Sequence, residues 1–94
     1  MSTHRPRYRY IAFRVEGPQP FRREQVLDAL HRLPDPPWLV GFDDPKGLVR
    51  CTHRQKEATI DALRAIRVIA GVAVQVTTLG TSGTIRAATR KYLS

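Results

Sequence analysis

The segment Arg7-Tyr-Arg-Tyr-Ile-Ala-Phe-Arg-Val15 decides the fold class of this 94-residue chain. From residue 9 onward its polar and apolar side chains alternate, which is the pattern of a β-strand with one buried face. The buried side carries Ile11, Phe13 and Val15, and the opposite side carries Tyr8, Tyr10, Ala12 and Arg14. We therefore predict that a strand over residues 7–15 begins a sheet with two different faces.

Helical and strand patterns alternate along the rest of the chain. Apolar residues recur at helical spacing in two stretches, and a short basic stretch near the end is also typical of a helix. We predict helices over residues 21–33, 55–70 and 84–93, the second ending at Gly71. Alternating or β-branched residues predict strands over residues 38–42, 48–53 and 72–77, and Gly, Pro and Asp predict turns at 17–20, 43–47 and 80–83.

This order of elements, strand–helix–strand–strand–helix–strand, is that of the split βαβ arrangement. We predict an α+β fold, a two-layer βαββαβ sandwich of the ferredoxin-like or RRM-like kind with an added C-terminal helix. It forms a single domain over residues 1–94, with residues 1–6 as a flexible basic tail. In this topology the first and third strands are central and both crossover helices cover one face.

The opposite face of the sheet stays open unless the tail helix or a partner covers it. By alternation we expect it to display Tyr8, Tyr10, Arg14, Arg50, Thr52, Gln75 and Thr77. RNA-recognition-motif domains hold single-stranded RNA on such a face, by stacking bases on aromatic side chains. The stretch Lys46-Gly-Leu-Val-Arg-Cys-Thr-His53 contains no aromatic residue, which disfavours stacking on that strand. The alternative is that Tyr8 and Tyr10 pack against a protein partner or the tail helix.

Basic residues gather at both ends of the chain. The formal net charge is +8, and 13 of the 16 basic residues are Arg, whose guanidinium group binds phosphate bidentately and stacks on bases. All eight acidic residues lie between Glu16 and Asp61, so residues 1–14 and 62–94 contain none. If the two ends meet in space, they form one positive surface for a polyanion. The alternative is an arginine-rich solvated surface with no partner.

Several other classes of protein are disfavoured. No apolar run approaches the roughly 20 residues that cross a membrane, and we expect neither a signal peptide nor membrane binding. The single cysteine, Cys51, excludes an internal disulfide and fits a cytoplasmic protein.

The inventory of reactive side chains predicts no catalysis by this chain alone. His4, His31 and His53 lack the spacing of metal ligands, and a single cysteine cannot form a zinc cluster. Asp43 and Asp44 precede Pro-Lys-Gly and are expected to form a turn. Acylphosphatase shares this size and topology but depends on an Asn, and the chain contains no Asn. We therefore expect no catalytic residue, no metal site and no cofactor bound by this chain.

The C-terminal segment Gly80-Thr-Ser-Gly-Thr-Ile-Arg86-Ala-Ala-Thr-Arg90-Lys91-Tyr-Leu93 has features of an anion site. Two glycines predict a turn with free amides before a helix, which Thr81 or Ser82 would cap. Arg86 and Arg90 are four residues apart and would share a helix face, flanked by Lys91. The alternative is ordinary capping of a surface helix.

Three segments of the chain resemble the family of ribonuclease P protein component 2, found in archaea and eukaryotes. They are the basic strand Arg7-Tyr-Arg-Tyr10 with Ile11-Ala-Phe13, the strand Val49-Arg-Cys-Thr-His53, and Gly83-Thr-Ile-Arg86 followed by Lys91-Tyr-Leu93. The resemblance spans nearly the whole chain. The chain departs from the family's pattern in two places: the connection Pro34-Asp-Pro-Pro37 is short, and the chain ends at Ser94, where many members continue.

The resemblance implies a subunit that binds the ribonuclease P RNA and pairs with protein component 3. The assembled ribonucleoprotein removes the 5′ leader from precursor tRNA, with catalysis by Mg²⁺ ions that the RNA holds. The competing functions are a ferredoxin-like protein–protein adaptor and another, ribosome-associated RNA-binding protein. Self-association is left open.

We assign the candidate residues on this basis. The residues expected to contact RNA are Arg86, Arg90, Lys91, Ser82, Gly83 and Thr84, with Arg5, Arg7 and Arg9 as a second cluster and Arg50 on the sheet. The residues expected to contact component 3, or else RNA, are Tyr8, Tyr10 and Arg14.

Overall fold

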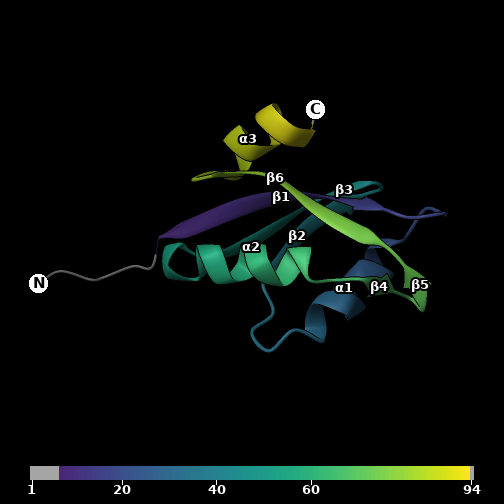
Figure 1. The fold of residues 1–94 in the computed structure, drawn as a ribbon. Coiled ribbons are helices and arrows are strands. Elements are labelled where there is room, and N and C mark those ends of the chain that lie inside the picture. Colours follow the sequence, from purple (N-terminus) through teal and green to yellow (C-terminus); the bar gives the residue numbers. More distant parts are fainter. Residues whose placement is uncertain (1–6, 94) are drawn as a thin grey trace, which may run out of the picture.

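A four-stranded antiparallel sheet forms the centre of the molecule (Figure 1). The computed structural model describes residues 7–93. The strands are β1 (Tyr8–Glu16), β2 (Trp38–Asp43), β3 (Lys46–Thr52) and β6 (Gln75–Ser82), in the spatial order β2-β3-β1-β6. Strand β1 pairs antiparallel with both β3 and β6, so β1 and β3 are central. This topology confirms the predicted ferredoxin-like α+β fold.

Two helices cover one face of the sheet, α1 (Arg23–His31) and α2 (Lys56–Arg64), the latter preceded by a 3₁₀ turn at His53–Gln55 (Figure 1). Both lie within the residue ranges expected from the sequence. The side chains that they bury against the sheet form the main core: Ile11, Phe13, Val15, Phe21, Val26, Leu30, Leu39, Val49, Cys51, Leu63, Ile69, Val74 and Val76. The alternation in β1 thus correctly identified the face that packs against the helices.

The segment after α2 differs from the prediction of a helix reaching residue 70. The helix ends at Arg64, and the two-residue strands β4 (Val68–Ile69) and β5 (Val72–Ala73) pair as a hairpin. Ala70 and Gly71 both have positive φ, 53° and 76°, as a two-residue hairpin turn of this hand requires. Gly71 therefore turns a hairpin and does not end a helix.

The predicted turn at residues 80–83 is also wrong, because the last strand runs through it. The register pairs Ala12 with Gly80, Ile11 with Thr81 and Tyr10 with Ser82. A shift in register between Ala12 and Phe13 separates this part of the ladder from the pairs that precede Gly80 along β6. The central strand β1 is long enough to pair with β6 as far as Ser82, and this pairing outweighs the local preference of glycine and serine for turns.

The tail helix lies on the sheet face opposite α1 and α2 (Figure 1). It consists of α3 (Ile85–Ala88) continued by a π-helical turn at Thr89–Leu93, which confirms the helix expected after Gly83. Ala88 packs against Ala12 and Leu48 in a second, smaller cluster of buried residues. The half-buried residues around this cluster are Tyr10, Val40, Leu79, Tyr92 and Leu93.

Gly80 allows the tail helix to approach the sheet closely. A Cβ atom at this position would overlap the ring of Tyr92. The glycine is therefore needed where an aromatic ring rests on the strand, and not for a turn. This explains why the sequence pattern around residue 80 was misinterpreted.

Candidate nucleic-acid interface

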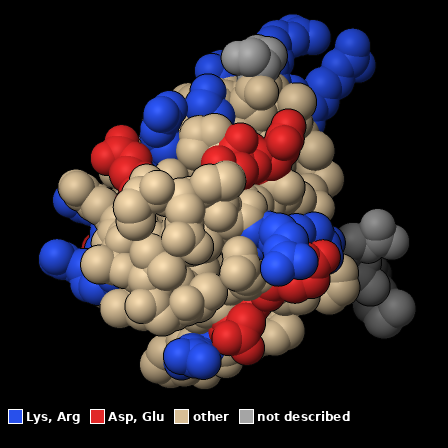
Figure 2. Space-filling model, turned by 90° about the vertical axis from the view of Figure 1, so that its right-hand side faces the viewer, with Lys and Arg blue, Asp and Glu red and all other residues tan. Residues whose placement is uncertain are grey.

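The outer side of the tail helix carries three basic side chains. Arg86, Arg90 and Lys91 are all exposed, because the opposite side of the helix packs on the sheet through Ala88 and Tyr92. In Figure 2 basic side chains project at the top of the view, where the tail helix lies in Figure 1, and acidic side chains lie lower. No acidic residue follows Asp61 in the sequence, so the tail helix contributes only positive charge. This arrangement suits the phosphate backbone of a nucleic acid.

The side chain of Thr84 caps the start of the tail helix. The Thr84 hydroxyl oxygen accepts a hydrogen bond from the backbone N–H of Ala87 at 3.1 Å. Thr84 therefore caps the helix, and the prediction that Thr81 or Ser82 does so is wrong, because both belong to β6. Ser82 is buried, whereas Gly83 and Thr84 are exposed. Ser82, Gly83 and Thr84 were all expected to contact RNA. Of these, Ser82 is buried as part of β6.

The basic residues of the N-terminal segment lie apart from the tail helix. Arg9 pairs in register with Cys51, which belongs to the main core, so Arg9 lies on the helix-covered side of the sheet. Its guanidinium donates to the backbone carbonyl of Tyr8 at 3.0 Å. The carbonyl of Arg7, just before β1, accepts from the backbone N–H of His53 at 2.7 Å. His4, Arg5 and the rest of the predicted tail, residues 1–6, lie outside the described residues.

The side chain of Arg50 lies between two aromatic rings on the tail-helix face of the sheet. Its guanidinium carbon is 4.4 Å from the centroid of the Tyr8 ring and 5.7 Å from the centroid of the Trp38 ring. The register places Trp38 directly opposite Arg50 on the neighbouring strand. The structure thus brings Arg50 and Tyr8 together. Sequence reasoning missed Trp38, although a lone Trp after two prolines at the start of a strand could have indicated it.

The tail helix divides the face that the sequence predicted to be open. Tyr10 is half-buried in the cluster beneath the helix. This agrees with the alternative prediction, in which Tyr10 packs against the tail helix. Tyr8 and Arg14 lie on either side of that cluster, six residues apart on β1, which is about 20 Å. Arg14 pairs with Glu16 at 3.6 Å. Tyr8, Tyr10 and Arg14 therefore do not form one continuous exposed surface.

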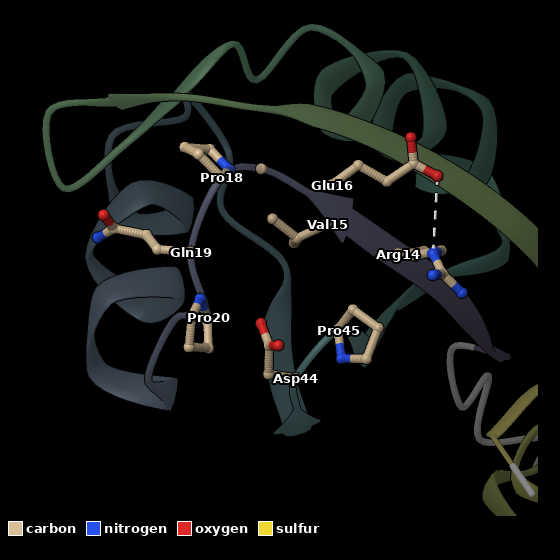
Figure 3. Close-up of a pocket in the computed structure, with 9 residues that line it drawn as sticks. Arg14, Val15, Glu16, Pro18, Gln19, Pro20, Asp44 and Pro45 are labelled. Carbon is tan, nitrogen blue, oxygen red and sulfur yellow. Dashed lines mark ion pairs between the residues drawn. The ribbon is translucent and has the colours of Figure 1, made fainter.

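The hollow drawn in Figure 3 lies between β1, the loop that follows it and the β2–β3 turn. Its volume is about 390 Å³, and its charged groups are Arg14, Glu16 and Asp44. The Asp44 carboxylate accepts a hydrogen bond from the backbone N–H of Phe21 at 3.1 Å, which ties the β2–β3 turn to the loop before α1. Asp44 thus makes a structural contact, and it lies in the turn that the sequence predicted for it. Among residues 7–93, no three His, Cys, Asp or Glu side chains gather as metal ligands would.

Cys51 belongs to the core. Burial raises the pKa of its thiol above the ordinary value, although a hydrogen bond with Thr59 and the charge of Arg9 both lower it. A thiol that is buried and kept protonated is a poor nucleophile. The cysteine therefore contributes to packing. It lies two residues after Val49 on β3, so both side chains point to the same face of the sheet and enter the main core.

Comparison with known protein families shows to which family the chain belongs. Residues 39–93 match the model of the Rpp14/Pop5 family. This chain belongs to the Rpp14/Pop5 family. The matched region runs from β2 to the end of the tail helix, so it contains both Arg50 and the basic side chains of the helix.

Individual relatives of this Rpp14/Pop5 member match nearly its whole length. Ribonuclease P protein component 2 of Thermococcus kodakarensis is 36% identical over an alignment that covers 98% of this chain and 88% of that protein. The protein of the same name from Thermococcus gammatolerans is 34% identical with the same coverage. That from Methanosarcina mazei is 30% identical, over 99% of this chain and 90% of that protein.

A solved structure shows the same fold. One chain in the cryo-EM structure of yeast ribonuclease MRP superimposes with a TM-score of 0.67 at 13% identity, covering 88% of this chain and 79% of that one. The fold of this Rpp14/Pop5 member thus also occurs in a chain of the yeast ribonuclease MRP structure. Within residues 7–93, no helix is both long and apolar enough to span a membrane.

Proposed function

We propose that this member of the Rpp14/Pop5 family is a protein subunit of ribonuclease P, the ribonucleoprotein that removes the 5′ leader from precursor tRNA. The observation that carries the proposal is the 30–36% identity, over 98–99% of the chain, to proteins named ribonuclease P protein component 2. The exposed basic side of the tail helix gives this role a physical basis.

In this role the chain binds the ribonuclease P RNA and stabilises its active shape. Arg86, Arg90 and Lys91 each neutralise a phosphate, while Gly83 and Thr84 bring the backbone at the start of the helix close to the RNA. Phosphate contacts of this kind position an RNA without reading its sequence. The Mg²⁺ ions of the cleavage reaction are held by the RNA, and this chain supplies no catalytic group. The assembly acts in the cytoplasm on precursor tRNA.

The proposal includes pairing with protein component 3. The tail helix already covers Tyr10, so the partner meets the sheet face at the end of β1 that carries Arg14 and not over the centre of the sheet. The end that carries Arg14, paired with Glu16 and opposite Lys46 in the ladder, offers charges of both signs. Mixed charge of this kind suits a protein partner better than a polyphosphate chain.

The salt dependence of RNA binding tests this proposal. Replacing Arg86, Arg90 and Lys91 together by Ala should flatten the slope of log affinity against log salt by roughly 2–3, because each phosphate contact contributes about 0.7–0.9. The matched control replaces Arg54, Arg64 and Arg67, which are three exposed basic residues in the part of the chain around α2. The control variant should retain most of the slope.

The outcome separates the proposed function from its competitors. If RNA binding by the unmodified chain does not depend on salt, the chain is an adaptor and the proposal fails. If the slope is the same in the unmodified chain and the tail-helix variant, the tail helix is an ordinary surface element. Cleavage of precursor tRNA by reconstituted ribonuclease P, with and without this chain, distinguishes a ribonuclease P subunit from a ribosome-associated RNA-binding protein.

A further inference from the structure

Trp38 is unusually exposed for the only tryptophan of the chain. It leaves 65% of its surface to solvent, the largest fraction among the exposed large hydrophobic side chains. It stands at the start of β2, an edge strand of the sheet. Tryptophan is enriched at interfaces, because burying its large ring in a complex is strongly favourable.

A hollow of about 400 Å³ lies beside this ring, between α1 and the start of β2. Its apolar wall consists of Leu27, Pro36, Pro37, Trp38 and Leu39. Its two remaining lining residues, Arg23 and His31, are both basic, and no acidic residue lines it. The hollow thus combines an aromatic side chain, Trp38, with the positive charge of Arg23.

The cations around the indole are available to a ligand. Within residues 7–93, neither Arg23 nor Arg50 has a carboxylate within 4.0 Å, whereas Arg14 and Arg32 each form an ion pair. The guanidinium of Arg50 lies over the indole, where it fixes the ring without neutralising its own charge. An apolar peptide in the hollow would leave the charge of Arg23 uncompensated, whereas a nucleotide offers a flat base to the ring and a phosphate to this cation.

We propose that this hollow binds one unpaired base of single-stranded RNA, stacked on the indole of Trp38, with an adjoining phosphate on Arg23. The inference rests on the proposed function and adds to it a contact with a base, where the tail helix contacts phosphates only. Stacking of this kind accepts any base, since every base has a flat face.

The position of the hollow follows from the way the sheet is covered. In RNA-recognition-motif domains the bases stack on the central strands. Here Tyr92 and Ala88 cover the central strands, so that platform is closed. On the edge strand β2 the ring of Trp38 remains exposed, and Arg50 links it to Tyr8 at the start of β1, which is also exposed.

The fluorescence of the single tryptophan reports directly on this site. The intact chain is titrated at low salt with three probes: a single-stranded oligouridylate, an abasic oligoribonucleotide of the same length, and a double-stranded RNA. Each probe carries a dye, so that anisotropy measures binding independently of the tryptophan. We expect quenching of Trp38 by the oligouridylate, and little quenching by the abasic and double-stranded probes when they are bound to the same extent.

Variants of the ring test the energetic role of stacking. Trp38→Leu should weaken binding of the oligouridylate about tenfold, since one stacked base contributes this order of affinity, and leave binding of the abasic probe unchanged. Trp38→Phe should recover part of the loss. The matched control is Val68→Ala, because Val68 is 55% exposed on the β4–β5 hairpin and does not line the hollow; this variant should bind like the unmodified chain.

Failure of this inference differs from failure of the proposed function. If the oligouridylate binds by anisotropy without quenching Trp38, or the abasic probe quenches equally, the hollow is not a base site and the RNA-binding role stands. If no probe binds, the RNA-binding role itself fails. Quenching or protection of Trp38 by component 3 and not by RNA would identify the hollow as a protein interface and overturn the inference.

Discussion

The two faces of the sheet are covered in different ways. Within residues 7–93, α1 and α2 enclose a hydrophobic core of thirteen buried residues on one face, whereas the buried hydrophobic cluster under the tail helix consists of Ala12, Leu48 and Ala88. Because stabilisation scales with the apolar area removed from water, most of the free energy of folding belongs to the first face. The second face can therefore open locally while the rest of the molecule stays folded.

This difference relates the fold to the candidate site. The residues proposed to bind RNA lie on the tail-helix side, at the sheet edge or, for Arg23, on the exposed side of α1, and none of them belongs to the main core. Arg86, Arg90 and Lys91 are carried by an element that packs on the sheet through Ala88, Tyr92 and Leu93. Changes on this side should thus alter RNA binding far more than global stability, and changes on the other side should do the reverse.

The largest effect should come from the main core. Phe13 is 1% exposed, and Phe13→Ala should lower the free energy of unfolding by about 3–5 kcal/mol, because it removes a buried ring and leaves a cavity. Urea denaturation followed by circular dichroism measures the change. A loss of under about 1 kcal/mol would show that the helix-covered face does not dominate stability, and the comparison of the two faces would fail.

A smaller effect should come from the contact between Gly80 and Tyr92. Gly80→Ala should cost about 1–3 kcal/mol, since the new Cβ overlaps the Tyr92 ring and the tail helix must shift. In a Tyr92→Ala background the same change should cost close to nothing. Hydrogen exchange should show faster exchange in residues 85–93 and unchanged protection in α2. Equal costs in the two backgrounds would mean that the ring does not rest on Gly80 in solution.

The smallest effect should come from Cys51 at high pH. Burial raises the pKa of its thiol in the folded protein above the ordinary value of 9.0. The unfolded chain therefore loses the proton first, so stability is fully present below pH 9.0 and decreases as the pH rises above it. Denaturation of the unmodified chain and of Cys51→Val between pH 7 and 10.5 isolates this contribution. A difference between the two that does not change with pH would contradict it.

The main layers of the fold were predictable because their patterns are long and unambiguous. The alternation around Ile11 and Phe13 specifies both the strand and its buried face, and the apolar spacing around Leu30 and Leu63 specifies the two helices. These predictions depend only on which side chains avoid water. They were confirmed to within a few residues at the ends of β1 and β3, and the second helix was expected several residues too long.

The region from residue 65 to residue 83 was predicted poorly because its structure depends on distant partners. Gly80 and Ser82 favour turns locally, but β1 supplies the ladder that makes them strand. Ala70 adopts a positive φ that sequence patterns rarely assign to alanine. Trp38 was overlooked as a site residue because its importance comes from the register that places it opposite Arg50.

The packing of the tail helix on the sheet also determines when this helix can dock during synthesis of the chain. The surface under the helix is built from three strands: β1 supplies Ala12, β3 supplies Leu48 and β6 supplies Gly80. These strands are separated by tens of residues, and the last of them leaves the ribosome just before the helix itself. A nascent chain thus has no docking surface for its basic helix until the sheet is complete. The basic side chains of the helix are therefore held on the sheet only in copies whose sheet has formed.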